Sequence, residues 1–202
     1  MKIYFTRHGQ TEWNKIQKNQ GWLNSELTPE GIQMGEKLRE ELKEIKFDKI
    51  FTSDIKRAYH TAELIKPDQE LVKTPLLREI DLGDWSGKYF KDLPEIDPQR
   101  FDNYFNHPEK YFPEQGESFI DLMDRIEKFF KEYVENKNYK TILIVSHGVT
   151  MTAIMNYMEK NNIENFWTNK VRKNGEINIA EYQNRKYTMI KKAGEYNQYT
   201  AG

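Results

Sequence analysis

The sequence predicts an α/β fold: a three-layer α/β/α sandwich with a mostly parallel central sheet, one antiparallel edge strand and an irregular, aromatic-rich insertion. Two observations support this fold class. Short runs of β-branched and aromatic residues alternate along the chain with longer segments of helical periodicity, as in sheets built from strand, helix and strand. The 202 residues, 37% of them hydrophobic, suffice for one core but not for two, so we expect a single domain over residues 1–202.

The first strand and the first long helix are predicted close to the start of the chain. Residues 2–6, KIYFT, form a short β-branched and aromatic run that fits a buried strand. Residues 27–45 follow after a loop, with Thr28 as the expected N-cap and Pro29 at the first helical position. The apolar side chains of this segment lie on one helical face: Ile32, Leu38, Leu42 and Ile45. We therefore expect a helix packed on a sheet.

The same alternation repeats in the next part of the chain. Residues 48–53, DKIFTS, predict a second strand. A helix is expected over residues 55–65, with Ser53 or Asp54 as its cap. A further short strand is expected near residues 70–73.

The C-terminal half completes the pattern. Residues 117–134 have the most regular helical spacing in the chain, carried by Phe119, Leu122, Met123, Ile126, Phe129, Phe130 and Tyr133. A strand over residues 141–146 leads directly into a helix over 147–158. Residues 176–190 read as two strands joined by a turn, which places an antiparallel edge on the sheet.

Two segments do not fit the alternation. Residues 88–116 hold four of the seven prolines and a group of aromatic side chains: Tyr89, Phe90, Phe101, Tyr104, Phe105, Tyr111 and Phe112. This segment is interpreted as an insertion that packs over another part of the fold, either as a satellite cluster or as a substrate lid. Residues 192–202 are expected to form a loose tail.

The composition limits the classes of partner. Lysine and arginine number 31 against 32 acidic residues, so the net charge of −1 gives no reason to expect nucleic acid as a partner. Cysteine is absent, which excludes thiolate chemistry and suits a reducing compartment. No stretch reaches the roughly 18 apolar residues of a membrane helix, and the N-terminus lacks a signal-peptide pattern. We expect a cytoplasmic protein without membrane contact.

Ionisable residues follow the predicted strands at the point where each strand ends. The first strand runs into Arg7 and His8, and the strand over 141–146 runs into His147. The helix after the second strand carries Arg57 in its first turn. Ligands of open α/β sheets bind beyond the carboxyl ends of the strands. These four side chains are therefore expected to converge on one site.

Two guanidinium groups and two helix N-termini suit a dianionic phosphoryl group. A neutral imidazole can attack phosphorus without first losing a proton, so a histidine is a reasonable nucleophile. The leaving oxygen then needs a general acid, and the segment LLREIDLGDWSG offers Glu79, Asp81 and Asp84.

Each of these residues also has a structural interpretation. His8 could cap a turn, Arg57 could be a solvated helix residue, and His147 could be a core histidine. For His60 and His107 the structural interpretation is preferred. The DLGD stretch has no histidine at ligand spacing, so we expect a solvated turn there and no metal site.

Several segments together resemble the histidine phosphatase superfamily, the cofactor-dependent phosphoglycerate mutase-like proteins. The segment TRHGQTEWN is similar to the opening signature of that family, and QGWLNSELTPEG to the segment after it. The stretches TSDIKRAYHTAE, LREIDLGDWSG, GESF and VSHG match the later blocks in the same order. The resemblance covers residues 2 to about 180.

The resemblance implies a phosphohistidine mechanism. His8 would attack phosphorus, Arg7, Arg57 and His147 would surround the phosphoryl oxygens, and Glu79 would serve as general acid and base. The phosphate site and its approach would be lined by Asn14, Gln20, Gly21 and Gly148. The family needs no metal. His60 stands where relatives often carry glutamine, and it could reach the edge of the pocket.

Phosphatases and mutases of this family share the pocket. Mutases usually carry a longer, arginine-rich insertion, whereas the cations of this insertion are scattered over Lys88, Lys91, Arg100 and Lys110. We therefore expect a phosphatase acting on a small phosphorylated metabolite, without cofactor, as a monomer or homodimer. The alternatives are a mutase that depends on 2,3-bisphosphoglycerate, a metal-dependent phosphohydrolase and a non-catalytic phosphate-binding module.

Overall fold

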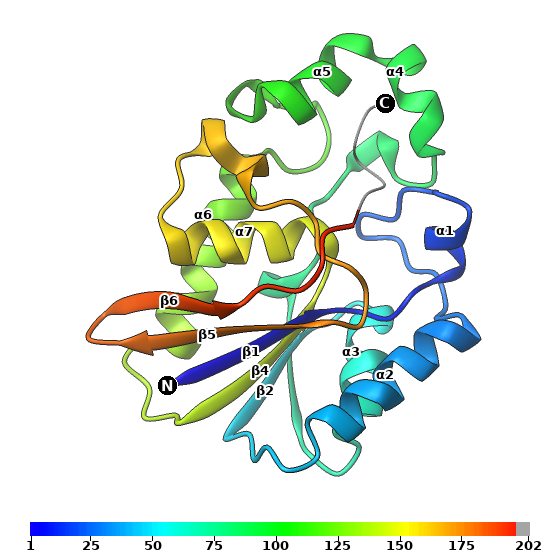
Figure 1. The fold of residues 1–202 in the computed structure, drawn as a ribbon. Coiled ribbons are helices and arrows are strands. Elements are labelled where there is room, and N and C mark those ends of the chain that lie inside the picture. Colours follow the sequence, from blue (N-terminus) through cyan, green and yellow to red (C-terminus); the bar gives the residue numbers. More distant parts are fainter. Residues whose placement is uncertain (197–202) are drawn as a thin grey trace.

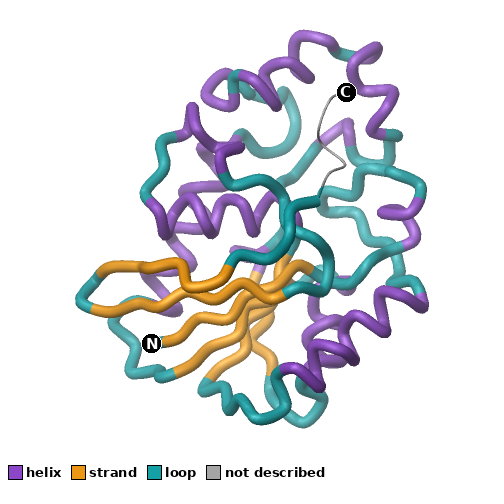
Figure 2. Tube along the Cα trace, in the orientation of Figure 1, coloured by secondary structure: helices purple, strands orange, loops and turns teal. Residues whose placement is uncertain are grey.

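A six-stranded sheet forms the centre of the molecule in the computed structural model, which describes residues 1–196 (Figures 1 and 2). The order of the strands across the sheet is β3-β2-β4-β1-β5-β6. Their bounds are β1 (Lys2–Arg7), β2 (Lys49–Ser53), β3 (Leu71–Thr74), β4 (Thr141–Ser146), β5 (Ile177–Gln183) and β6 (Lys186–Lys191). All six expected strands are present.

The sheet is mostly parallel, as the sequence predicts. Strands β1, β4, β2 and β3 run parallel to one another, β5 is antiparallel to β1, and β6 is antiparallel to β5. The segment read as two strands and a turn is the β5-β6 hairpin. Its turn residues Asn184 and Arg185 both have positive φ, at 51° and 58°, as a tight hairpin turn with right-handed strand twist requires.

Helices cover both faces of this sheet, which confirms the three-layer prediction. The helices α2 (Pro29–Glu41) and α3 (Lys56–Ile65) lie on one face, and α6 (Phe119–Phe129) and α7 (Gly148–Glu159) lie on the other (Figure 1). Side chains of β4 alternate between these two layers: Ile142 and Ile144 join the larger core under α6 and α7, whereas Leu143 and Val145 join the core under α2 and α3.

The N-cap predicted from the local sequence is correct for α2 but not for α3. Thr28 caps α2 by accepting from the N–H of Gly31, with Pro29 in the first turn, as predicted. The expected cap of α3 is wrong: its N-cap is Ile55, which makes no side-chain cap bond. Instead, Asn24 accepts a hydrogen bond of 3.0 Å from the N–H of Arg57. The capping group is thus supplied by a distant loop.

Helix ends differ from the prediction in two places. The helix α2 ends at Glu41 and not at 45. The continuous helix expected over 117–134 is α6 followed by a π-helical turn over Phe130–Val134, in which Glu135 N–H donates to the Phe130 carbonyl at 2.7 Å. Phe130 and Val134 are both completely buried.

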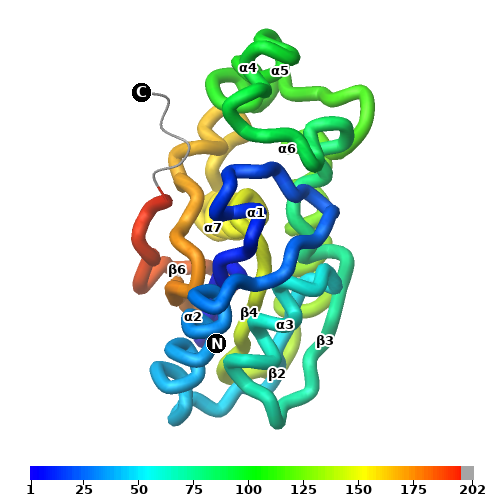
Figure 3. The backbone as a smooth tube through the Cα atoms, turned by 90° about the vertical axis from the view of Figure 1, so that its right-hand side faces the viewer, coloured from blue at the N-terminus to red at the C-terminus, as the bar shows by residue number. Residues whose placement is uncertain are grey.

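The insertion is more regular than the sequence suggests. It contains the helices α4 (Leu93–Ile96) and α5 (Pro98–Asn106), which lie together at the top of Figures 1 and 3, away from the sheet. Tyr104 is 5% exposed and belongs to the larger core, where its ring contacts Trp85 and Phe119. The remaining helical elements are α1 (Glu12–Lys15) and 3₁₀ segments at Pro75–Leu77, Gly83–Trp85, Phe90–Asp92, Pro108–Lys110 and Ile163–Thr168.

The first part of the predicted loose tail is held in place. Ala193 N–H donates to the side-chain oxygen of Asn178, and Tyr196 N–H donates to the Val171 carbonyl, both at 2.8 Å. The prediction is therefore wrong for residues 192–196, whereas 197–202 lie outside the described residues. Within residues 1–196, no helix is long and apolar enough to cross a membrane.

Candidate active site

The site begins where two adjacent parallel strands end. Strand β1 pairs with β4 in a register that sets Arg7 opposite Ser146, and His8 N–H donates to the Ser146 carbonyl at 2.9 Å. The next residues, His8 and His147, therefore leave the sheet side by side, with ring centroids 5.3 Å apart. The expected convergence of these strand ends is present, and α7 starts directly after His147.

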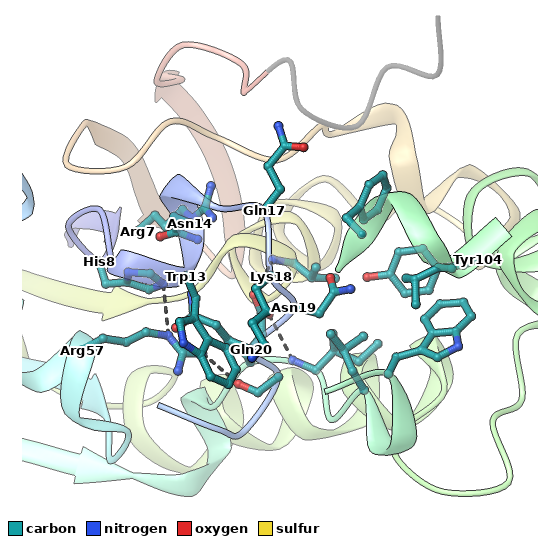
Figure 4. A pocket seen from close by; sticks show the side chains of 18 of the residues that line it. Arg7, His8, Trp13, Asn14, Gln17, Lys18, Asn19, Gln20, Arg57 and Tyr104 are labelled. Atoms are coloured by element: carbon teal, nitrogen blue, oxygen red, sulfur yellow. Dashed lines mark hydrogen bonds between the residues drawn. The ribbon is translucent and has the colours of Figure 1, made fainter. Parts of the chain in front are cut away.

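The ring of His8 is held in one tautomer. Its Nδ1 lies 2.7 Å from the Gly9 carbonyl oxygen, which can only accept, so Nδ1 carries the proton. Its Nε2 is then unprotonated, and its lone pair accepts a hydrogen bond of 3.2 Å from Nε of Arg57 (Figure 4). The side chain is 2% exposed. The unprotonated Nε2 of His8 thus faces the guanidinium of Arg57.

Both histidines of the site are held neutral. Burial lowers the pKa of His8 well below its usual range, and the positive charges of Arg57 and Arg7 add to this shift. Burial also lowers the pKa of His147, followed by the charge of Arg57. Within the part of the chain that the structure describes, neither ring nitrogen of His147 has a hydrogen-bond partner.

These pKa shifts predict how the stability of the fold depends on pH. The unfolded chain protonates its histidines below an ordinary pKa of 6.5, whereas the folded chain keeps His8 and His147 neutral. The unfolded state therefore binds more protons, and the free energy of unfolding falls as the pH drops from about 7 toward about 5. Each histidine contributes a slope of up to about 1.4 kcal/mol per pH unit.

Urea unfolding at a series of pH values tests this dependence. The variant His8→Asn should lose one of the two contributions, so its slope should be shallower than that of the wild-type chain by about one proton. Identical slopes for the two chains would contradict the assignment of a neutral, buried His8.

Arg57 links His8 to the loop after α1. It is 2% exposed, and its two terminal nitrogens donate to the carbonyls of Leu23 at 2.6 Å and Gly21 at 2.8 Å. Burial lowers its pKa to about 10, so the guanidinium remains charged at neutral pH. Gly21 has a φ of +50°, and a Cβ there would lie 2.7 Å from the Ser86 hydroxyl.

Arg7 lies on the other side of His8. Its Nη1 donates to the Arg172 carbonyl at 3.3 Å, and its guanidinium carbon lies 5.0 Å from the ring centre of Tyr196. Its Nε has no hydrogen-bond partner among the described residues. A Cβ at Gly148 would come within 3.4 Å of this guanidinium, so the glycine lets the arginine lie against the start of α7.

Glu79 lies at the N-terminus of α7. Its carboxylate oxygens accept hydrogen bonds from the backbone N–H of Val149 at 3.1 Å and of Thr150 at 3.0 Å. The guanidinium of Arg125 donates to the Glu79 carbonyl at 3.2 Å and pairs with Glu117 at 2.7 Å. Because Arg125 also bonds the carbonyls of Leu76 and Arg78, this ion pair positions the whole segment that carries Glu79.

One pocket gathers seven of the nine predicted site residues, whereas His147 and Gly148 are not among its lining residues. Arg7, His8, Arg57 and Glu79 line it together with the expected approach residues Asn14, Gln20 and Gly21. The other two acids are elsewhere: Asp84 pairs with Arg100 at 2.8 Å, and Asp81 accepts from the Gly83 N–H. His60 is not among the pocket residues, and His107 is on the surface beside Asp102 and Glu109.

Several supporting residues were missed by sequence reasoning. Thr61 accepts a hydrogen bond from the N–H of Gly9, and Asn174 donates to the His8 carbonyl at 2.8 Å. Arg125 and Tyr196 support Glu79 and Arg7 as described. None of these four lies near its partner in the sequence, so no local pattern could have identified them. Only the GESF segment, which contains Glu117, was singled out as a motif.

An α/β sandwich with two histidines and two arginines at the carboxyl ends of its strands has the features of a protein that binds an anionic, phosphate-like ligand there. Comparison with known families makes this specific. The chain belongs to the histidine phosphatase superfamily (branch 1), whose family model matches residues 3–193.

The relatives include several phosphatases. The chain is 31% identical over 170 residues to phosphoserine phosphatase 1 of Hydrogenobacter thermophilus. The aligned region covers 83% of this chain and 81% of the relative. It is 31% identical over 157 residues to the adenosylcobalamin/alpha-ribazole phosphatase of Escherichia coli, covering 77% of each. Among solved structures it is similar to Bacillus stearothermophilus YhfR, with a TM-score of 0.90 and 30% identity over 96% of this chain and 98% of that one.

Proposed function

We propose that this protein is a metal-independent phosphatase that hydrolyses small phosphomonoesters through a covalent phosphohistidine on His8. The observation that supports this most strongly is the state of the His8 ring. Its Nε2 is unprotonated, accepts a hydrogen bond from Arg57 and is buried near the positive charges of Arg57 and Arg7. Such a nitrogen can attack phosphorus directly, while the two guanidinium groups attract the dianionic phosphoryl group.

In the first step, Nε2 of His8 forms a bond to phosphorus as the bond from phosphorus to the alcohol oxygen breaks. Arg57 exchanges its hydrogen bond with His8 for one to a phosphoryl oxygen, and Arg7 and His147 contact the other oxygens. Protonated Glu79 gives its proton to the leaving oxygen, so the alcohol departs neutral.

In the second step, the same carboxylate takes a proton from water. The hydroxide equivalent attacks phosphorus, the bond to Nε2 breaks, and inorganic phosphate leaves. Asn14, Gln20 and Gly21 line the approach to this centre, and Gly148 lets the guanidinium of Arg7 lie against the start of α7. No metal or organic cofactor is needed in either step; 2,3-bisphosphoglycerate would be required only by a mutase.

A panel of phosphate esters tests the proposal. We expect phosphate release from p-nitrophenyl phosphate and from at least one alkyl ester in buffer containing a chelator. Isomerisation of phosphoglycerate should be absent with and without 2,3-bisphosphoglycerate. Stimulated isomerisation with little phosphate release would make the protein a mutase, and loss of hydrolysis in chelator would favour a metal-dependent phosphohydrolase.

A further inference from the structure

The pocket has two chemically different ends. Figure 4 shows His8 and Arg57 at one end and Tyr104 at the other. Apolar side chains make up a large part of the lining, beside the polar residues Gln17, Lys18 and Asn19: Leu82, Trp85, Phe90, Leu93, Tyr104 and Phe105. The leaving group of a phosphate ester bound at His8 must extend into the end that holds Tyr104, because the phosphoryl group occupies the cationic end.

This apolar wall is built into the core. Trp85 is 1% exposed and Leu93 2% exposed, so both are fixed by packing on all other sides. The ring of Phe105 lies 5.8 Å from that of Phe90 and stacks on Trp167 at 5.7 Å. The position of the wall is therefore set by packing within the fold.

Backbone hydrogen bonds join this wall to the segment that follows α1. Asn19 N–H donates to the Lys88 carbonyl at 2.9 Å, Gly87 N–H donates to the Asn19 carbonyl at 2.8 Å, and Phe90 N–H donates to the Gln17 carbonyl at 3.0 Å. Since Gly21 of the same segment is bonded to Arg57, the apolar wall and the cationic end have a fixed separation.

Charged groups are confined to the cationic end and the rim. Among the pocket residues in the described part of the chain, Glu79 is the one carboxylate. The cation outside the phosphate end is Lys18, whose ammonium lies 4.3 Å from the ring centre of Trp13. Arg100 lies behind Trp85, 4.3 Å from its ring centre, and its charge is paired with Asp84.

A zwitterionic or anionic leaving group would therefore be poorly accommodated. The ammonium of an amino acid would need a carboxylate, and Glu79 is the one carboxylate among the described pocket residues. A carboxylate on the leaving group would have only Lys18, whose ammonium already lies over the ring of Trp13. Charges buried without partners are strongly unfavourable. An aromatic ring, in contrast, would bury apolar area against other rings and gain from their edge-to-face or stacked arrangement.

On the basis of the function proposed above, we infer that the substrate is the phosphate monoester of an uncharged alcohol that carries an aromatic or bulky apolar group. The wall around Phe105 selects this group, and it selects against amino-acid and sugar-acid esters. The specificity of this chain then differs from what the name of its phosphoserine phosphatase relative states for that protein.

Three alkyl esters of similar intrinsic reactivity separate recognition from chemistry: 2-phenylethyl phosphate, ethyl phosphate and phosphoserine. We expect kcat/KM for the phenylethyl ester to exceed that for the ethyl ester by about 10- to 100-fold, mainly through KM. Phosphoserine should be no better than ethyl phosphate. A phosphoserine value equal to or above the phenylethyl value would overturn the inference.

Two variants locate the selectivity. Phe105→Ala should lower the ratio of phenylethyl to ethyl kcat/KM by about tenfold, and Phe105→Leu should retain most of it. Phe112→Ala is the matched control, because Phe112 is 65% exposed in the same insertion and does not line this pocket. The ratio is independent of the fraction of folded enzyme. An unchanged ratio in Phe105→Ala would overturn the assignment of this wall.

The same assay distinguishes this inference from the function on which it rests. Absence of phosphate release from every ester, p-nitrophenyl phosphate included, would reject the phosphatase itself. Hydrolysis of all esters with phenylethyl and ethyl phosphate equal would reject the apolar subsite alone.

Discussion

Replacing His8 with alanine is expected to abolish phosphate release from alkyl and aryl esters alike, by at least about a thousandfold in kcat. The reason is that His8 carries the one imidazole among the described residues that line the pocket. His147 could not substitute, because its ring centroid lies 5.3 Å from that of His8 and it is not among the residues that line the pocket. Steady-state release of inorganic phosphate measures the loss.

A binding measurement and a trapping experiment separate lost chemistry from lost structure. The His8→Ala protein should still bind inorganic phosphate, because Arg7, Arg57 and His147 remain. Wild-type protein quenched during turnover should carry a phosphoryl group that is stable in alkali and labile in acid, and the variant should carry none. The matched control is His107→Ala, since His107 lies on the surface of the insertion and should not matter. Wild-type rates in His8→Ala would reject the covalent mechanism.

Replacing Glu79 with glutamine is expected to slow alkyl esters by about a hundredfold to ten-thousandfold and p-nitrophenyl phosphate by much less than that. An alkoxide is a poor leaving group and needs the proton that Glu79 donates, whereas nitrophenolate leaves without one. Glutamine keeps one of the two oxygens that accept from Val149 and Thr150, and its NH2 replaces the other, so the ratio of the two ester types, and not the absolute rate, reports on proton transfer. The measurement is the ratio of kcat values for the two ester types in both proteins.

The nearest matched control for this variant is Asp81→Asn. Asp81 belongs to the same segment, but its carboxylate accepts from the Gly83 N–H and does not line the pocket. Its substitution should leave the ratio of the two ester types unchanged. If Glu79→Gln slows alkyl and nitrophenyl esters equally, the carboxylate has a role other than protonation of the leaving group.

The ordered alternation of strands and helices was predictable because it depends on local side-chain periodicity. Ile3 and Phe5 alternate with Tyr4 along β1, and this alternation is what a sheet covered on both faces requires. The cap at Thr28 was predictable for the same reason, since the hydroxyl and the N–H it satisfies lie within one turn.

The errors occur where distant segments intervene. The start of α3 is capped by Asn24, and the helix expected over 117–134 changes to a π-helical turn at Phe130. The insertion forms α4 and α5 because Tyr104 can bury its ring against Trp85 and Phe119, and neither partner is near it in the chain. Residues 192–196 are held because Asn178 accepts from Ala193.

By itself the sequence determined the α/β class, the strand ends that carry Arg7, His8 and His147, and the family that these motifs indicate. Only the tertiary structure decided which nitrogen of His8 holds the proton, which acid reaches the pocket, and what lines its far end. The physical reason is the distance along the chain between the groups that interact. Periodicity and capping act within a few residues, whereas burial, tautomer choice and pocket shape depend on groups brought together by the fold.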